Sequence, residues 1–533
     1  MKQPSRKLRK LILQDCRKAM IPSTIWYLVD EGGTALLMVY MASILGAFAD
    51  AVFSLNLALG TEQIGKILIC VGIMVVVIPS IGMIGEVIMF DNCLKHDRII
   101  LGRFLDKEYE EVMRIPEGEA QHRLEEDPIE LRCYWQDIVV RCIVTPIVFL
   151  YLIVKGGEIS LIFTGLTFLI SLIKLLVPIM VKKLEARYDL ETRAYKDMES
   201  CYEREIIAQP HIVKMYGLKD SMINRLNEMY YTYFKEVQVK SIVCQTVSKN
   251  ILGFLDTFCV LIILLIGAIM VVRGILTPGA VTAMVGYFSI FNLIMSNIDF
   301  LIRKVPILRN TVTRMEIIYS DAEALEGKEI EQPLSIIAED VNFSYGEREI
   351  LKGVNFEMSA GNKVVIAGAN GSGKSTLIKV LCGLVKGYKG SIKINNIQLN
   401  EVDIGTWRKQ IGYVPQTPYL FEGTVKENIH MGNLAATEEE VDRIMQHMDI
   451  TYLSERAIGV SQKDLSGGEK QKISIARALL KDTPILIFDE PNNNLDQESL
   501  LWVKDFIAKT ERTVLFVWHD YLLENKGYKQ LKL

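Results

Sequence analysis

The residues with the clearest potential for chemistry lie at 368–375, which read GANGSGKS and match the spacing G-x-x-x-x-G-K-S. An apolar run at 364–367 precedes them and a helix-like run at 376–384 follows, so the pattern predicts strand, loop and helix. The glycines let backbone N–H groups point at phosphate oxygens, Lys374 can reach the outer phosphates, and the Ser375 hydroxyl can hold magnesium. The residues that we expect to contact a nucleotide here are Gly368, Asn370, Gly371, Ser372, Gly373, Lys374, Ser375 and Thr376.

A second set of reactive residues lies downstream, where the apolar run 484–488 ends in Asp489 and Glu490. A buried strand that ends in aspartate is where a nucleotide site places its second magnesium contact, and the adjacent glutamate can orient or deprotonate an attacking water. Between the two motifs, residues 465–469 read LSGGE and begin a predicted helix. The free N–H groups and positive dipole end of that helix attract anions. The residues expected to face a phosphate there are Ser466, Gly467 and Gly468.

Residues 335–533 resemble the nucleotide-binding domain of ABC transporters. The resemblance rests on three motifs in this order: the phosphate loop, the LSGGE turn and the strand that ends in Asp489 and Glu490. The resemblance implies ATP as the nucleotide, Mg²⁺ as its metal, and ATP hydrolysis as the activity. The stretch 459–464 departs from the family pattern, and only a short tail follows His519, where relatives usually add a strand and a helix. Neither departure removes a residue of the implied ATP site.

The same resemblance implies roles for four further residues. Tyr345 matches the aromatic residue that stacks on adenine, and Gln416 matches the glutamine that contacts magnesium and water. Asp496 matches an aspartate that crosses to the partner subunit, and His519 matches a histidine that touches the terminal phosphate. The implied catalytic residues are Glu490, His519, Gln416 and Lys374, and the implied magnesium ligands are Ser375, Gln416 and Asp489.

Composition restricts the class of protein. Hydrophobic residues make up 50% of the 533 residues, and the apolar mass lies before residue 310. The net charge of −4 indicates no polyanionic partner, which argues against a machine that binds nucleic acid. The nine cysteines include no C-x-x-C pair, so neither a zinc motif nor a redox motif is indicated.

Six stretches are long and apolar enough to cross a membrane, which takes about 20 residues. They are 33–53, 66–90, 137–155, 159–181, 249–273 and 279–302. Lys and Arg concentrate in the N-terminal segment and in the connections 91–136 and 182–248, so we expect these parts and the ATPase domain in the cytoplasm. We expect an integral, multi-pass protein of a bacterial inner membrane. Its predicted parts are a transmembrane domain at 1–320, a linker at 321–334 and the ATPase domain at 335–533.

Long inner connections and short outer loops resemble the six-helix membrane domain of ABC exporters. The expected fold class is therefore a multi-domain membrane protein, with an all-α six-helix transmembrane domain followed by an α/β P-loop ATPase domain that carries a helical lobe. The resemblance also implies short helices that dock on the ATPase domains. We expect them at 118–124 with Asp127, and at 203–217.

Ionisable residues inside the predicted spans allow two interpretations, because a charge in hydrocarbon is costly. Glu86, Asp256 and Asp299 fall toward the cytoplasmic side, and Asp299 can pair with Arg303 four residues later. Such acids either pair internally, beside cations such as Arg141 and Lys174, or line a cavity that attracts a cationic or amphipathic cargo.

The family implies a dimer, because the phosphate loop of one ATPase domain and the LSGGE turn of another clamp each ATP. With one domain of each kind, this chain is expected to pair with a second copy of itself or with a sibling half-transporter. The predicted function is ATP-driven export of an amphipathic substrate (peptide, lipid or drug-like molecule) across a lipid bilayer. The alternative is an ATP-gated membrane regulator or channel of the same architecture. The six spans argue against a soluble ATPase of DNA repair or translation.

Overall fold

The computed structural model describes residues 6–173, 176–320, 327–332, 334–459, 465–492, 495–518 and 528–533. The chain forms two compact units. The first contains Met1–Leu105 and Glu117–Ser320, and the second contains Asp106–Pro116 and Asp321–Leu533. The short segment Asp106–Pro116 therefore leaves the helical unit between two of its helices and joins the C-terminal unit.

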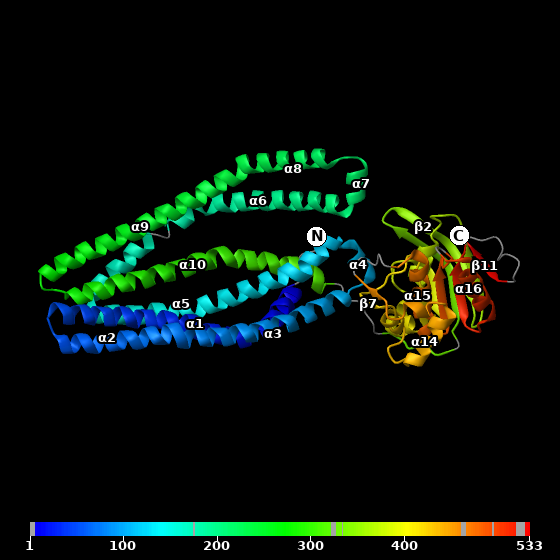
Figure 1. The fold of residues 1–533 in the computed structure, drawn as a ribbon, viewed down its shortest axis with the longest axis horizontal. Helices are drawn as coiled ribbons and strands as arrows, with labels where there is room; N and C mark the ends of the chain where they lie inside the picture. Colours follow the sequence, from blue (N-terminus) through cyan, green and yellow to red (C-terminus); the bar gives the residue numbers. More distant parts are fainter. Residues whose placement is uncertain are drawn as a thin grey trace. The chain divides into compact units, whose positions relative to one another are not determined.

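The first unit consists of helices (Figure 1). Two π-helical segments, η1 and η2, interrupt them. In chain order the elements are α1 (Arg6–Phe53), α2 (Leu57–Gly72), η1 (Ile73–Val77), α3 (Ile78–Leu105), α5 (Glu117–Ile173), α6 (Leu176–Ala208), α7 (Pro210–Met215), α8 (Lys219–Tyr233), η2 (Phe234–Gln238), α9 (Val239–Val272) and α10 (Pro278–Tyr319). Helices α1, α3, α5 and α10 pack against one another, whereas α6 packs against α9, which also contacts α10.

Five helices among the described residues are long and apolar enough to cross a membrane. Helix α5 contains the predicted span 137–155 and the first part of the predicted span 159–181. Its backbone is extended at Ser160 (φ −167°, ψ 115°), which divides the helix between these two spans. The Ser160 hydroxyl oxygen accepts a hydrogen bond from the Phe163 N–H at 3.3 Å, which caps the second part. The predicted spans at 66–90, 249–273 and 279–302 lie along α2–α3, α9 and α10.

Helices α1 and α10 approach each other most tightly at two glycines. A Cβ atom at Gly279 would lie 2.1 Å from the carbonyl oxygen of Gly46, so a side chain cannot be placed there without moving the helices apart. The Asp50 carboxylate fixes the start of α10, because it accepts hydrogen bonds from the Thr277 hydroxyl at 2.8 Å and the Gly279 N–H at 2.7 Å. These contacts join α1 and α10 at one end of the bundle.

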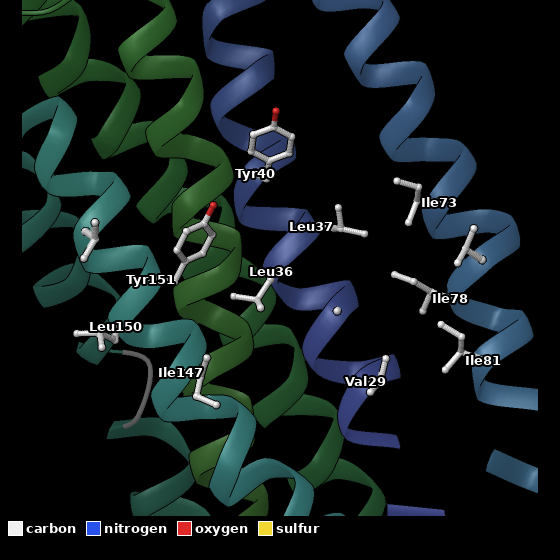
Figure 2. A pocket seen from close by; sticks show the side chains of 13 residues that line it. Val29, Leu36, Leu37, Tyr40, Ile73, Ile78, Ile81, Ile147, Leu150 and Tyr151 are labelled. Atoms are coloured by element: carbon white, nitrogen blue, oxygen red, sulfur yellow. The ribbon is translucent and has the colours of Figure 1, made fainter. Parts of the chain in front are cut away.

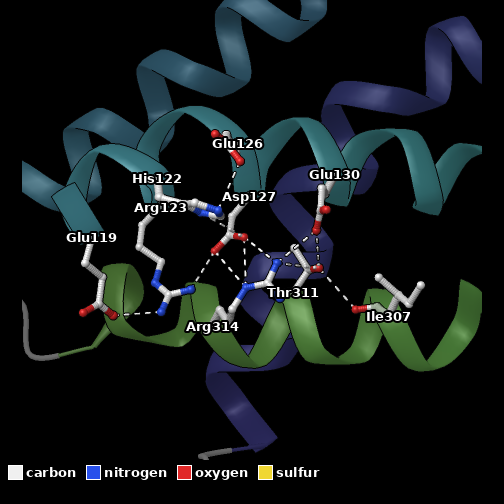
Figure 3. Close-up of polar contacts among 9 residues, drawn as sticks. All are labelled: Glu119, His122, Arg123, Glu126, Asp127, Glu130, Ile307, Thr311 and Arg314. Atoms are coloured by element: carbon white, nitrogen blue, oxygen red, sulfur yellow. Dashed lines mark hydrogen bonds and ion pairs between the residues drawn. The ribbon is translucent and has the colours of Figure 1, made fainter. Parts of the chain in front are cut away.

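A buried carboxylate joins α5 and α10 at the other end (Figure 3). The Asp127 side chain is fully buried and accepts hydrogen bonds from Arg314 of α10 at 2.6 and 3.0 Å. Arg123 of α5 donates to the same carboxylate at 3.0 Å, and Glu130 accepts a second bond from Arg314 at 2.9 Å. Asp127 and residues 118–124 therefore belong to the long helix α5 and not to a separate docking helix, which corrects the expectation from the sequence.

The second unit is an α/β domain that contains two larger sheets. The antiparallel sheet has the order β2-β1-β4-β5 and the parallel sheet has the order β11-β3-β10-β9-β6. The strands are β1 (Ile336–Tyr345), β2 (Arg348–Met358), β3 (Lys363–Ala367), β4 (Lys389–Ile394), β5 (Ile397–Gln398), β6 (Ile411–Val414), β7 (Gly423–Thr424), β8 (Ala457–Ile458), β9 (Ile485–Asp489), β10 (Thr513–Val517) and β11 (Lys529–Lys532). Strands β9 and β10 are buried along their whole length, which is typical of a parallel sheet covered on both faces.

Helices cover the parallel sheet and build a lobe beside it. They are α4 (Tyr109–Arg114), α11 (Lys374–Leu381), α12 (Ile404–Lys409), α13 (Val425–His430), α14 (Glu438–His447), α15 (Gly467–Leu480) and α16 (Gln497–Lys509), with 3₁₀ turns at Leu399–Glu401 and Thr451–Leu453. Helices α13, α14 and α15 pack together as the helical lobe. The predicted fold class, an all-α membrane domain followed by an α/β ATPase domain with a helical lobe, is confirmed.

The tail after residue 527 is ordered into the fold. Strand β11 runs parallel to β3, with Leu531 opposite Ile366, and the Leu533 N–H donates to the Ala367 carbonyl at 2.9 Å. The strand that carries the phosphate loop is therefore paired on both sides, by β10 and by β11.

Candidate nucleotide site

The phosphate loop lies between β3 and α11, as the sequence predicts. Gly371 and Gly373 have φ angles of +82° and +102°, a left-handed conformation that glycine adopts without strain. The Ser372 hydroxyl is buried and has no hydrogen-bond partner among the described residues. A buried donor without a partner costs free energy, so the loop is built to satisfy it with a ligand oxygen.

Lys374 is folded onto its own loop. Its ammonium group donates to the carbonyl oxygens of Gly368 and Ala369, at 3.0 and 3.1 Å. The side chain is buried, with 6% of its surface exposed. Because these carbonyls belong to the loop that would surround phosphates, the amine is already positioned at the anion site and can exchange carbonyl contacts for phosphate contacts.

Ser375 and Asp489 meet although 114 residues separate them in the chain. The Ser375 hydroxyl at the start of α11 donates to Asp489 Oδ1 at the end of β9, over 3.3 Å. Burial raises the pKa of the Asp489 carboxyl, while the Ser375 hydroxyl opposes this shift and the neighbouring Glu490 adds to it. A hydroxyl and a carboxylate side by side form the oxygen donor set that Mg²⁺ prefers, so these residues fit the metal that the sequence implies.

Glu490 and Gln416 also form a contact pair. The Gln416 side-chain amide donates to Glu490 Oε2 at 2.7 Å. Glu490 has a φ angle of +51°, a left-handed conformation that residues other than glycine adopt only at an energetic cost. Residues in such strained conformations cluster at functional sites. The Gln416 amide holds the Glu490 carboxylate in place, where it can orient or deprotonate a water.

Tyr345 ends β1 next to the turn into β2. Its ring is 48% exposed and packs edge-on against Phe343, with ring centroids 4.9 Å apart. One face of the ring is therefore free of the core, and a stacked base remains a prediction. His519 lies outside the described residues, so its predicted role rests on the sequence.

The LSGGE turn caps helix α15. The Ser466 hydroxyl oxygen accepts from the Glu469 N–H at 3.2 Å, and Glu469 Oε2 accepts from the Ser466 N–H at 2.7 Å, which forms a capping box. The Ser466 hydroxyl hydrogen stays available to a ligand. Within the described part of the chain, no hydrogen bond or ion pair joins Ser466, Gly467 or Gly468 to the phosphate loop.

Asp496 caps the start of helix α16 and pairs with helix α15. Its carboxylate accepts from the Ser499 N–H at 2.7 Å and forms an ion pair with Lys472 of α15 at 3.0 Å. The hydrogen bonds from Ser499, followed by the contact with Lys472, lower the pKa of Asp496 to about 2. The predicted contact of this aspartate with a partner subunit stays a prediction.

The sequence interpretation missed a contact between α4 and the ATPase domain. The backbone N–H and the ammonium group of Lys386 bind Glu110 and Glu108, at 3.0 and 2.9 Å. The ammonium group of Lys379, on the helix that follows the phosphate loop, lies 5.9 Å from the ring centre of Tyr109. The segment Asp106–Pro116 therefore packs with the ATPase domain in one compact unit, whereas 118–124 belongs to the helical unit. Helix α4 has only six residues, which is too short for an apolar periodicity to indicate it in the sequence.

The acids predicted inside the spans have contacts within the helical unit. Asp299 pairs with Arg303, 2.8 Å from its Nε, as its spacing predicts. Asp256 accepts a hydrogen bond from Asn292 at 3.0 Å. Glu86 accepts a hydrogen bond from the Tyr27 hydroxyl. Arg141 bonds to Asn297, and Lys174 lies outside the described residues.

Comparisons with known proteins agree with both units. Residues 351–493 match the family described as ABC transporter, and residues 137–295 match the ABC transporter transmembrane region. A structure of a bacterial Atm1-family ABC exporter with ATP bound superimposes with a TM-score of 0.77 at 20% identity, covering 94% of this chain and 92% of that one. At this identity the likeness shows the shared fold.

Curated relatives match parts of the chain. The transport/processing ATP-binding protein ComA of Streptococcus pneumoniae is 32% identical over 286 residues, which are 49% of this chain and 40% of ComA. The ATP-dependent lipid A-core flippase of Desulfotalea psychrophila is 30% identical over 337 residues, 60% of this chain and 57% of the flippase. The aligned region thus spans about half the length of these relatives. With a transmembrane region and an ATPase domain of this family in one polypeptide, the chain belongs to the ABC transporters and has the architecture of an exporter-type half-transporter.

Proposed function

We propose that this chain hydrolyses ATP as part of a dimer and uses the hydrolysis to export an amphipathic substrate across a membrane. The observation that carries the proposal is the pairing of Ser375 with Asp489 and of Gln416 with Glu490 around one phosphate loop. A metal site and a base next to a phosphate site are the parts that phosphoryl transfer to water requires. The intact Glu490 favours a transporter that turns over ATP above an ATP-gated regulator or channel.

The residues of the chain divide the chemistry among them. Lys374 and the loop N–H groups would hold the phosphates of ATP, and Ser375 with Asp489 would hold Mg²⁺, which offsets phosphate charge when bound. Glu490 would orient the attacking water and accept its proton, with Gln416 holding the carboxylate in position. His519, by resemblance, would contact the terminal phosphate.

A second chain is needed to complete the site. The LSGGE turn presents the Ser466 hydroxyl and the N–H groups of a helix start. Among the residues that the structure describes, it has no bond to the phosphate loop of its own chain. A head-to-tail dimer would place that turn on the ATP of a partner. We favour a second copy of this chain, and a sibling half-transporter is the alternative.

The long apolar helices favour a position in a lipid bilayer. Basic residues concentrate in the N-terminal segment and in the connections 91–136 and 182–248, which favours the cytoplasm for these parts and for the ATPase domain. The membrane that we propose is the inner membrane of a bacterial cell. Within the ATPase unit, α4 contacts the helix that follows the phosphate loop through Lys379 and the next loop through Lys386. A closing ATPase domain would carry α4 with it, and with α4 the covalently attached ends of α3 and α5.

The proposal is tested with the purified protein in nanodiscs. The wild type should hydrolyse ATP. Glu490→Gln should bind ATP but lose hydrolysis by roughly 10²–10⁴-fold, the contribution typical of a positioned general base. Lys374→Ala should lose ATP binding and hydrolysis together. Hydrolysis at the wild-type rate in Glu490→Gln, or hydrolysis by a protein that stays monomeric at every dilution, would overturn the proposal.

A further inference from the structure

An apolar groove runs along the surface of the helical unit, between α1, the η1–α3 segment and α5. It encloses about 800 Å³. Figure 2 shows Val29 and Leu37 of α1 on one side of the space and Ile73, Ile78 and Ile81 on the other. Val29 and Tyr40 both line the groove, and α1 rises about 16 Å between them, so the groove is about as long as an extended long alkyl chain.

Two local features keep the groove open. The π-helical segment η1, Ile73–Val77, forms part of its wall and has no buried residue. Such segments are rare and frequently accompany functional sites. Gly33 lines this groove and also a neighbouring cavity of about 320 Å³, and a Cβ there would meet only Ile78 Cδ1, at 3.8 Å. A larger side chain at position 33 would therefore enter free space.

Two carboxylates lie at the Val29–Ile81 end of the groove. Asp30 reaches across to α3, because its Oδ2 lies 3.1 Å from the position of a Cβ at Gly82. Glu86 lies one turn further along α3 and accepts a hydrogen bond from the Tyr27 hydroxyl. Over the described ranges, neither carboxylate has a Lys, Arg or His partner at ion-pair distance.

The missing counter-charge distinguishes these acids from Asp127 and Asp299, which have cationic partners within the helical unit. Asp299 has Arg303, and Asp127 has Arg123 and Arg314. Carboxylates near hydrocarbon are costly and are usually paired, so an uncompensated pair at the end of an apolar groove is complementary to a cation attached to an apolar chain.

We propose that this groove binds a single-chain cationic amphipath from the membrane, with its alkyl chain between Leu37 and Ile78 and its amine between Asp30 and Glu86. The inference rests on the proposed function, because it assigns the chemical class of the cargo. An anionic head group would be repelled at the carboxylate end, and an uncharged chain would leave both acids without a counter-charge.

The test uses Trp26, which lies beside the acidic end, since its Cβ is 3.0 Å from the position of a Cβ at Gly85. Dodecylpyridinium, a cation that quenches tryptophan fluorescence, is titrated into nanodiscs that hold the full chain. The signal is the part of the quenching that Trp26→Phe removes. Dodecylamine should displace the probe at a concentration about tenfold lower than dodecanol, which corresponds to one good charge-assisted contact.

Two variants separate the chain from the head group. Asp30→Asn combined with Glu86→Gln should abolish the preference for amine over alcohol, whereas Gly33→Leu should weaken both ligands. Glu62→Gln is the matched control, because Glu62 of α2 pairs with Lys66 and lies away from the groove lining. ATP hydrolysis without the probe should stay at the wild-type level in all of them, and dodecylamine should stimulate it only where the groove and acids are intact.

Three outcomes would overturn the inference. They are equal displacement by dodecanol and dodecylamine, unchanged binding in the double variant, and selective amine binding without any stimulation of ATP hydrolysis. Failure of the proposed function is distinguishable, because the wild type would then hydrolyse no ATP even before a probe is added.

Discussion

Replacing Asp127 with asparagine tests whether the buried carboxylate holds α5 and α10 together. The side chain of Asp127 is completely buried, and it accepts bonds from Arg314 and Arg123, which are 29% and 17% exposed. Removal of one partner from a buried ion pair costs about 3–5 kcal/mol. We expect the lower end, about 3 kcal/mol, because Arg314 keeps Glu130 and part of its contact with water.

The assay is thermal or denaturant unfolding of the full chain in nanodiscs, followed by helical circular dichroism. Asp91→Asn is the control, since Asp91 forms an exposed pair with Lys95 four residues away and should change stability by less than about 0.5 kcal/mol. The double variant Asp127→Asn with Arg314→Gln should cost less than the sum of the two single variants, because both substitutions remove the same ion pair. Equal, small effects of Asp127→Asn and Asp91→Asn would refute the argument from burial.

The remaining predictions concern coupling, pH and packing. Lys386→Ala should leave basal ATP hydrolysis unchanged but reduce its stimulation by cargo. The charge swap Lys386→Glu with Glu108→Lys should restore the stimulation, because it restores the ion pair. Normal stimulation in Lys386→Ala, or no stimulation in the charge swap, would contradict this role of the ion pair. Because the pKa of Asp496 is lowered from 3.8 to about 2, its stabilising effect is complete above pH 3.8 and is lost as the pH falls through 2, so the unfolding midpoints of wild type and Asp496→Asn should converge over that window. Gly279→Val should prevent stable packing of α1 on α10 and reduce the yield of folded protein, whereas Gly253→Val, at an open position on α9, should not.

The phosphate loop of the candidate nucleotide site could be predicted because its parts are local in the chain. The phosphate loop is a strand, a turn and a helix that are contiguous in the chain, and Asp489 follows a run of apolar residues that only a buried strand explains. The magnesium role assigned to both Ser375 and Asp489 implied that these two residues meet. The hydrogen bond from Gln416 to Glu490 required the fold, because it joins loops 74 residues apart.

The membrane helices could be predicted from the length of the apolar runs, but their polar contacts could not. Charged side chains at helix ends resemble one another in sequence whether they face water, a docking domain or another helix. Asp127 was therefore assigned to a docking segment although it is buried against α10, and α4 was overlooked although it contacts the ATPase domain. Asp30 precedes the first predicted span, so its place beside Gly82 depends on the packing of α1 on α3.

Strand β11 has a consequence for solubility and for the choice of truncations. It covers one side of β3, the strand that leads into the phosphate loop. Without residues 528–533, the main-chain groups of β3 would form an uncovered sheet margin, and such margins recruit strands from other molecules. Shortened versions of the ATPase unit should therefore self-associate through the strand that leads into the nucleotide site, and their loss of ATP binding would reflect aggregation and not damaged chemistry.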